Sequence, residues 1–508
     1  MTDLAAITPH LRRRFAERRV VFWHDSAGQY SDGLDAMDLP GISLVRVANN
    51  EFALKHQLLL QQPSDKILVY RSGEMPTGID NWLADLEFAY GVFTADHGSL
   101  VAQDLGLAAS GIDDVVREHA AFFGKDKFVQ SLKALLKPDD DEVLLRAKMT
   151  AVVLGQSEHS LLEITRTLLV ENAKGVRTKY DALGKQGLID FYWAGVSRIY
   201  GYASDEPSID DFVLWLFDVA IAGFVSDRPG GLQNARLDLA GLRHDPRSQG
   251  ALAMLAMRAS KDLDYKSRIK DADFRDLRSD DYFPETDQRI ITGLVAAIAE
   301  QSISARDVGD IVRTRQTSAW IDRYRLHYRA IETGAELLHQ LSTLDTSLTS
   351  FDQALDRYRS EWFRIDQLYR QFCHAYRSCE ESSVLDSLRA QVESRYTSKF
   401  LYELGASFQK QLDGVNEWRS AALRSQQSFY ESRIARITRS GKKAVVIVSD
   451  ALRYEAAEEL GSRIRHEDRF DAELDAMLGV LPTYTQLGMA ALLPHDGLKH
   501  SEAAKIVL

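Results

Sequence analysis

The chain has 508 residues, of which 45% are hydrophobic and 27% charged, and its formal net charge is -12. At about 150 residues per domain, this length predicts roughly three domains with ordinary hydrophobic cores. Because neutralising phosphates requires clustered Lys and Arg, so acidic a chain is poorly suited to non-specific nucleic-acid binding. A local basic site, or a metal ion that supplies positive charge, is still compatible with this composition.

Targeting and redox signals are weak. The first residues have no basic start followed by an apolar stretch, so we expect no signal peptide. The most apolar segment, residues 212–225, is shorter than the roughly 20 residues that span a bilayer, and we expect a buried helix there. Cys373 and Cys379 lie in a helical pattern at a spacing that cannot pair locally. We therefore expect reduced thiols in a cytoplasmic protein without a membrane segment.

The first hundred residues predict a small α/β domain, which we place at residues 1–105. Strand patterns at residues 20–25, 42–47 and 66–71 alternate with helical character at residues 51–61. Strands that alternate with helices indicate a small parallel sheet with helices packed on it.

Two histidines in this part and the next could attract a catalytic interpretation. His24 and Asp25 end the first predicted strand, but neighbouring strand residues point to opposite faces, which favours a structural role. His159 stands where a helix is expected to begin, a position that fits helix capping better than catalysis.

After residue 105 strand patterns vanish, and we predict a helical region over residues 106–435, with a possible subdivision near residues 227–250. No proline occurs between Pro284 and Pro482, which favours long helices. Apolar residues recur at helical spacing in several segments, namely 113–136, 142–154, 160–172, 209–225 and 288–300.

One apolar seam in this region is open to two interpretations. Steps of three and four residues join Leu355, Tyr358, Trp362, Ile365, Tyr369, Phe372 and Tyr376. Such a seam is typical of helices packed side by side, and the alternative is an aromatic platform for bases or a cofactor. Core packing is favoured, because polar residues fall on the other faces.

A basic run follows the helical region and ends just before the last α/β pattern. It consists of Arg433, Arg436, Arg439, Lys442 and Lys443. A solvated helix end is the favoured interpretation, because cations suit the negative end of the helix dipole. The alternative is a patch that steers phosphate groups.

The most informative residues lie near the C-terminus. Residues 444–449 form a compact strand pattern that ends on Asp450, where a carboxylate could either bind a cation or cap the following helix. Thr485 begins a second helical segment, where its hydroxyl could either cap the helix or act as a metal-activated nucleophile. Spacing alone leaves the Asp450 alternatives open, and taken alone Thr485 is better explained as a cap.

Together the two residues resemble the PglZ domain, a branch of the alkaline-phosphatase superfamily. The match rests on the string Asp450-Ala451-Leu452-Arg453-Tyr454-Glu455, followed by Pro482-Thr483-Tyr484-Thr485. The resemblance implies that Asp450 binds metal and that Thr485 is both nucleophile and metal ligand, with Thr483 the less favoured choice. It also implies two divalent metal ions, expected to be zinc.

Upstream segments extend this resemblance to the type A PglZ proteins of BREX phage-defence systems. The similar segments are residues 19–25, 50–55, 66–71 and 81–87. We expect an α/β plus all-α chain whose residues 436–508 begin an alkaline-phosphatase-like domain. The family's further Asp and His ligands lie well downstream of the nucleophile, and His495, Asp496 and His500 stand too close behind Thr485 to replace them. We therefore expect a C-terminally truncated chain that is catalytically silent by itself.

Three functions remain open on sequence alone. The complete protein would be a metal-dependent phosphoesterase acting on a phosphate monoester, a diester or nucleic acid. The present 508 residues are expected to dock other BREX subunits through the N-terminal α/β and helical regions. The alternative is that the whole protein is a non-catalytic interaction scaffold with a degenerate phosphatase fold. A third interpretation is a DNA-contacting module at residues 433–443, which predicts binding that weakens steeply with salt.

Overall fold

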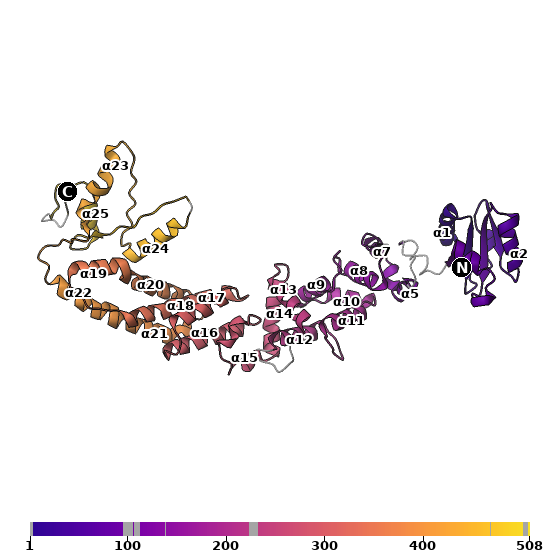
Figure 1. Cartoon of the computed structure of the whole chain (residues 1–508), viewed down its shortest axis with the longest axis horizontal. Coiled ribbons are helices and arrows are strands. Elements are labelled where there is room, and N and C mark those ends of the chain that lie inside the picture. Colours follow the sequence, from indigo (N-terminus) through magenta and orange to yellow (C-terminus); the bar gives the residue numbers. More distant parts are fainter. Residues whose placement is uncertain are drawn as a thin grey trace. The chain divides into compact units, whose positions relative to one another are not determined.

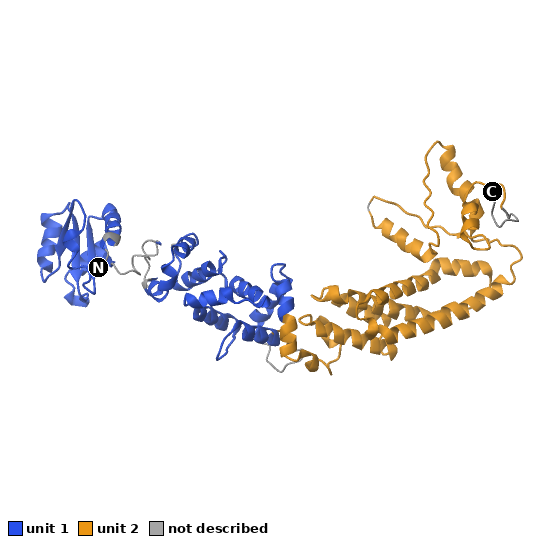
Figure 2. Ribbon diagram, turned by 180° about the vertical axis from the view of Figure 1, so that it is seen from behind, with its two compact units in different colours: residues 1–219, 231–255 blue, residues 220–230, 256–508 orange. Residues whose placement is uncertain are grey.

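The computed structural model describes residues 4–94, 105, 112–137, 139–222, 232–467, 469–500 and 506–507. The chain divides into two compact units, one of residues 1–219 and 231–255 and the other of residues 220–230 and 256–508 (Figure 2). The first unit contains a parallel sheet and a group of short helices, and the second contains longer helices and the C-terminal segment (Figure 1). The predicted combination of a small α/β part with a helical part is confirmed.

A four-stranded parallel sheet forms the N-terminal part, with strand order β2-β3-β1-β4. Three of its strands lie where the sequence predicts them, and the short β4 was not predicted. The strands are β1 (Val20–Asp25), β2 (Ile42–Arg46), β3 (Lys66–Ser72) and β4 (Val92–Thr94).

Helices cover both faces of this sheet. Helix α1 (Leu4–Glu17) packs on the face that carries Trp23, whereas α2 (Glu51–His56) and α3 (Ala84–Tyr90) belong to the face that carries Phe22. Because successive strand residues point to opposite faces, β1 contributes alternate side chains to the two cores. Short helical turns complete this part at η1 (Leu34–Ala36), η2 (Gln57–Gln61) and η3 (Gly78–Asp80).

The rest of the first unit is helical. Its helices are α5 (Ile112–Glu118), α6 (Ala120–Phe123), α7 (Asp126–Lys133), α8 (Glu142–Leu154), α9 (Leu161–Ala173), α10 (Thr178–Lys185), α11 (Ile189–Tyr200), α12 (Ile209–Ile221), α13 (Gln233–His244) and the start of α14 (Gln249–Asp262). The side chain of Ser160 caps α9, in agreement with the helix start expected beside His159.

Two segments with helical spacing in this unit are helical in the structure. Residues 113–136 form three short helices, α5, α6 and α7. His119 departs from helical dihedral angles and its buried ring contacts the carbonyl of Gln186, while Gly124 ends α6. In α12, Phe212 and Phe217 are fully buried as expected, and the final part of the prediction, residues 223–225, lies outside the described residues.

The second unit is built on longer helices. They are α15 (Tyr265–Arg268), η4 (Asp276–Ser279), α16 (Pro284–Ala299), α17 (Ala305–Arg315), α18 (Ile321–Thr343), α19 (Phe351–Arg357), η5 (Tyr358–Trp362), α20 (Phe363–Ser378), η6 (Ser382–Leu385), α21 (Asp386–Arg395), η7 (Tyr396–Leu404) and α22 (Gly405–Leu412).

The apolar seam lies on the continuous helical run of α19, η5 and α20. Trp362, Ile365 and Phe372 are buried, and the ring of Tyr369 stacks on that of Tyr396 at 3.8 Å between centroids. The prediction of core packing is confirmed. Cys373 and Cys379, near the end of α20, are free and partly buried, and burial raises the pKa of both thiols.

The C-terminal segment carries short elements. They are β5 (Arg424–Ser425), η8 (Gln426–Ser428), η9 (Tyr430–Ile434), α23 (Ala435–Arg439), α24 (Tyr454–Arg465), β6 (Met477–Leu478), α25 (Thr485–Leu492), β7 (Lys499–His500) and β8 (Ile506–Val507). Across the described ranges of both units, no helix combines the length and apolarity needed to cross a membrane.

The strand predicted at residues 444–449 does not form. Its side chains from Val445 onward are exposed, with Val445 at 87% and Ile447 at 88% of their maximum. A strand is stabilised by hydrogen bonds to a neighbouring strand, and none of the described strands pairs with this segment. The apolar pattern is therefore present without a sheet to bury it.

Candidate functional site

Asp450 and Thr485 meet in space. The Thr485 hydroxyl donates a hydrogen bond to Oδ2 of Asp450 across 3.2 Å, although the residues are 35 positions apart. Both side chains are exposed. Thr485, and not Thr483, is the threonine that contacts the carboxylate. The arrangement therefore brings together the two residues that the sequence singles out.

The alternative of simple helix capping fails for both residues. Helix α24 begins at Tyr454 after Arg453, without a side-chain cap, so Asp450 does not cap it. Thr485 is the first residue of α25, whose N-cap is Tyr484, and its hydroxyl contacts Asp450. Asp450 and Thr485 therefore contact each other, and neither side chain caps the helix next to it.

A tight turn presents Asp450. The amide of Leu452 approaches the carbonyl of Ser449 at 3.4 Å, and Ala451 has a positive φ of 58°. A left-handed conformation costs a residue with a Cβ atom about 1 to 2 kcal/mol. Contacts made by the residues before or after the turn must therefore offset the conformational cost of Ala451.

The residues after this turn contact α20 and also η5, which directly precedes α20. Arg453 forms an ion pair with Asp366 at 2.9 Å, and Arg370 donates to Glu455 at 2.8 Å. Between them the ring of Tyr454 meets that of Phe363 edge to face, with centroids 5.7 Å apart. Helix α24 thus lies beside α20, as Figure 1 also shows.

Thr485 is held by a different set of contacts. The side-chain amide of Gln426 donates to the carbonyl of Gly488 at 3.0 Å and accepts from the amide of Val480 at 3.2 Å. The indole of Trp418 donates to the carbonyl of Gly479 at 2.7 Å. One glutamine therefore ties α25 to the loop that precedes it.

The other residues considered at the sequence level lie apart from this pair or add no ligands to it. His495 contacts the carbonyl of Leu493, two residues away, and it and Asp496 are not fully buried. His500 belongs to β7. Within the described ranges, no three or more His, Cys, Asp or Glu side chains are grouped so that they could hold a metal ion.

His24 and Asp25 make structural hydrogen bonds at the end of β1. The ring of His24 lies 2.6 Å from the carbonyl of Gly73, while the buried carboxylate of Asp25 accepts hydrogen bonds from the Tyr70 hydroxyl and the Tyr30 amide. The two side chains have separate partners, which agrees with the structural role expected for them.

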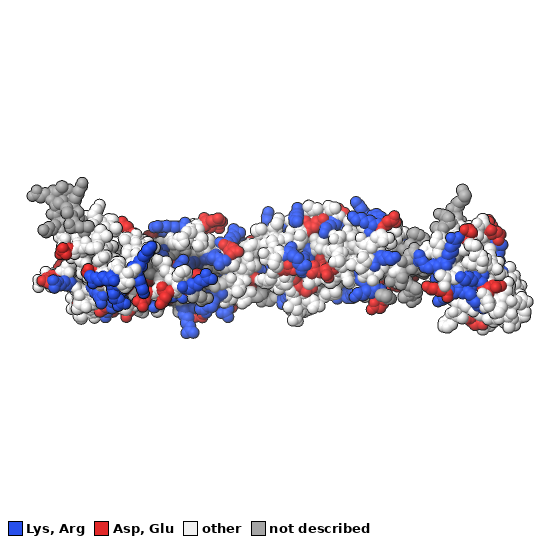
Figure 3. Space-filling view, turned by 90° about the horizontal axis from the view of Figure 1, so that it is seen from above, with Lys and Arg blue, Asp and Glu red and all other residues white. Residues whose placement is uncertain are grey.

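The basic run is partly neutralised. Arg433 pairs with Asp475, and Arg439 pairs with Glu431 at 2.9 Å. In the view of Figure 3, Lys and Arg are mixed with Asp and Glu along the surface. These pairs reduce the positive charge available to a phosphate backbone, and DNA contact at residues 433–443 stays an untested prediction.

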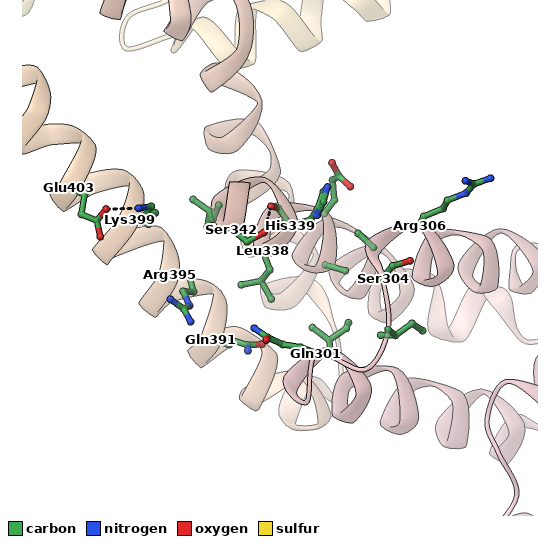
Figure 4. Close-up of a pocket in the computed structure, with 16 residues that line it drawn as sticks. Gln301, Ser304, Arg306, Leu338, His339, Ser342, Gln391, Arg395, Lys399 and Glu403 are labelled. Carbon is green, nitrogen blue, oxygen red and sulfur yellow. Dashed lines mark hydrogen bonds and ion pairs between the residues drawn. The ribbon is translucent and has the colours of Figure 1, made fainter. Parts of the chain in front are cut away.

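A cavity of about 860 Å³ lies elsewhere in the second unit, among α16, α17, α18, α21 and η7 (Figure 4). Lys399 and Glu403 pair on one side at 2.6 Å, and His339 and Ser342 lie on another. Its lining contains neither Asp450 nor Thr485, so it is separate from the candidate site.

Sequence reasoning missed the residues that hold the site. Asp366 and Arg370 lie on the apolar seam helix and Gln426 lies in a short turn, and nothing in their local pattern distinguishes them from surface residues. One signal was available, because residues 450–455 contain both Arg453 and Glu455. A charged side chain that becomes buried requires a partner of opposite charge.

Comparisons with known proteins agree with the geometry. Residues 429–508 match the family described as the BREX system PglZ alkaline phosphatase-like domain. The chain is 29% identical, over 96% of its length, to 60% of the alkaline phosphatase-like protein BrxZ of Escherichia coli O9:H4 (strain HS). It is 26% identical, over 96% of its length, to 59% of the alkaline phosphatase-like protein PglZ of Bacillus cereus (strain H3081.97). The chain thus spans 60% or slightly less of these curated relatives, and no solved structure matches it.

Proposed function

Since the chain belongs to the PglZ proteins of BREX systems, we propose that it acts in phage defence and carries the nucleophile of a phosphoesterase site. In this proposal Thr485 is the nucleophile and Asp450 is the carboxylate beside it. The hydrogen bond between them, at 3.2 Å, is the observation that carries the proposal.

The two side chains and the helix start suit attack on phosphorus. Asp450 accepts the hydroxyl hydrogen bond, which orients Thr485 and provides a base for its proton. Threonine oxygen then bonds to phosphorus as the bond to the leaving oxygen breaks, and water later releases phosphate from the threonine. The first amides of α25 lack acceptors within the helix and suit the oxygens of the phosphoryl group.

A metal site fits these residues only in part. Asp450 and Thr485 offer two oxygen ligands, whereas catalytic zinc takes three protein ligands and an open position. The superfamily generally uses divalent metals, and a bound ion would lower the pKa of the threonine hydroxyl. In our proposal two zinc ions bind, and the remaining ligands come from outside the described residues. We expect these 508 residues alone to hydrolyse phosphate esters no faster than the background.

The nucleophile is tested in the natural protein at its full encoded length. We would assay p-nitrophenyl phosphate and bis(p-nitrophenyl) phosphate with added Zn²⁺, which separates monoesterase from diesterase activity. Thr485→Ala should reduce hydrolysis to the background and Asp450→Asn should reduce it strongly. Thr483→Ala is the matched control and should retain activity. Full activity in Thr485→Ala would remove the proposal.

The same variants can be tested in cells. We would replace the gene in its BREX system and measure the efficiency of phage plating. Thr485→Ala should restore plating if hydrolysis serves defence. If Thr485→Ala keeps full protection while deletion of the gene loses it, the protein acts as a scaffold and its phosphatase-like site is dispensable.

A second candidate function, docking of other BREX subunits, is favoured by the outer faces of α2 and α3. These helices lie side by side, joined by an ion pair of Lys55 with Asp85 at 2.7 Å. Phe52 and Phe88 on their outer faces are 66% and 94% exposed, and Trp82 contacts Phe52. Exposed aromatic groups of this kind mark protein interaction sites.

Docking is tested by co-purification of the tagged chain with the other subunits. Phe88→Glu should weaken capture through the N-terminal part. Leu237→Glu, which changes a 61% exposed residue of α13, is the control. Equal capture by Phe88→Glu and the unchanged chain would exclude this surface.

A further inference from the structure

The turn that carries Asp450 is anchored mainly on one side. Before it, residues 443–449 pair with no described strand, and all of their side chains except that of the partly buried Ala444 are exposed. After it, residues 453–455 contact the helical run from Tyr358 to Arg370 at several points. Among the described residues, therefore, the position of Asp450 depends chiefly on the contacts made by the start of α24.

The first contact is built around a buried carboxylate. Asp366 is only 4% exposed and accepts from the hydroxyls of Tyr358 at 2.6 Å and Tyr396 at 2.5 Å. Arg453 adds the positive charge at 2.9 Å. A buried carboxylate is costly without a cation, so this site selects Arg453 over an uncharged residue.

The second contact has the opposite polarity. Glu455 is fully buried, and the single Nε–H of Arg370 donates a bifurcated hydrogen bond to its two carboxylate oxygens, at 2.8 and 3.1 Å. Arg370 also pairs with Glu459 one turn later on α24. Because the two contacts place opposite charges on each helix, they fix the direction and the register of α24 on α20.

We infer that Arg453 and Glu455 are positioning residues, which hold the Asp450 carboxylate beside the Thr485 hydroxyl by resting against Asp366 and Arg370 of α20. The inference rests on the proposed function for its catalytic meaning. The contacts on the α24 side also offset the conformational cost of Ala451, whose positive φ forms the turn that presents Asp450.

The test measures the distance without requiring turnover. In the 508-residue chain with Cys373 and Cys379 changed to Ser, Asp450→Cys and Thr485→Cys create a thiol pair. Dibromobimane bridges neighbouring thiols and becomes fluorescent when it does so. Since the cysteines abolish the hydrogen bond between the two residues, the bridging rate reports the anchors alone.

Arg453→Met should slow bridging about tenfold, because the buried Asp366 carboxylate loses its ion pair. Arg453→Lys should recover most of the rate. Arg465→Met is the matched control, because this arginine of α24 pairs with Glu458 of its own helix, and it should leave the rate unchanged. Asp366→Asn is a second variant with little change in volume and should slow bridging as Arg453→Met does, with no added effect in the double variant.

Unchanged bridging in both Arg453→Met and Asp366→Asn, with circular dichroism equal to that of the parent, would overturn the inference. Equal slowing by Arg465→Met would do so too, because it would indicate general loosening. In the natural protein, Arg453→Met should lower kcat and leave KM nearly unchanged. If bridging responds as expected but the natural protein hydrolyses no phosphate ester, positioning stands and the proposed function fails.

Discussion

The Thr485 hydroxyl and the Asp450 carboxylate share a hydrogen bond of 3.2 Å, yet the two residues are held by unrelated contacts. The position of Asp450 is set by the packing of α24 on α20, and the position of Thr485 is set by the hydrogen bond between Gln426 and α25. Because the anchors share no residue, weakening one should leave the other in place. The pair can therefore be disturbed from either side.

The anchor of Thr485 predicts a local effect of Gln426→Ala. Its side chain is the link between the carbonyl of Gly488 and the amide of Val480. Losing both bonds should raise amide hydrogen exchange in residues 480–488 about tenfold, since about 1.4 kcal/mol of local stability is removed. Mass spectrometry of the exchanged peptides measures this. Gln427→Ala changes the exposed neighbour and should exchange like the parent, and a similar increase there would contradict the assignment.

The contact of α24 with α20 predicts a particular response to acid. Burial opposes ionisation of Glu459, but hydrogen bonds from Arg370, Gln371 and Arg463 lower its pKa to about 2. The folded pKa lies below the unfolded value of 4.5, so the stabilisation is present above 4.5 and is lost as pH falls toward 2. The difference in urea midpoint between the parent and Glu459→Gln should shrink over this interval. Glu473→Gln, at an exposed position, should differ equally little from the parent at every pH.

Most of the elements that local patterns predicted are present, because in these segments the spacing of apolar residues matches the secondary structure that forms. Strands β1 and β3 are apolar runs with turns at their ends, and α8 covers the predicted segment, residues 142–154. The pair of Asp450 and Thr485 was chosen through a resemblance, and the structure places the two side chains in contact. Their chemical roles remain predictions.

The features that local patterns did not predict correctly, or at all, depend on distant partners. Residues 444–449 have the composition of a strand, but a strand requires hydrogen bonds from a neighbour that no local pattern describes. The break at His119 likewise reflects its contact with Gln186, far away in sequence. Asp366 was invisible for the same reason, because its partners come from three separate segments.

The sheet end at Asp25 should matter for stability alone. Asp25 is 5% exposed and accepts from the Tyr70 hydroxyl, while burial raises the pKa of that phenol and keeps it a donor. Tyr70→Phe leaves a buried carboxylate short of one donor and should cost about 1 to 3 kcal/mol of unfolding free energy. Tyr90→Phe, whose ring lies under the Arg19 guanidinium, is the control. Thermal unfolding of the two variants compares them, and equal midpoints would show that the Asp25 contact contributes nothing.

The strongest stability effect in the second unit should come from Arg315. This arginine is 1% exposed, and it donates to both carboxylate oxygens of the fully buried Asp287, at 2.9 and 2.8 Å. Arg315→Met leaves an uncompensated buried charge and should cost about 3 to 5 kcal/mol, whereas the exposed pair of Arg313 with Asp310 should contribute about 0 to 1 kcal/mol.

Urea unfolding of Arg315→Met and of the control Arg313→Met measures both values. Adding Asp287→Leu to Arg315→Met removes the stranded carboxylate as well, so the double variant should be more stable than Arg315→Met alone. Tyr328 would then lose its acceptor on Asp287, which limits the recovery to a partial one. If the double variant has a lower unfolding free energy than Arg315→Met, the carboxylate stabilises this core mainly through its other donors and not through the arginine.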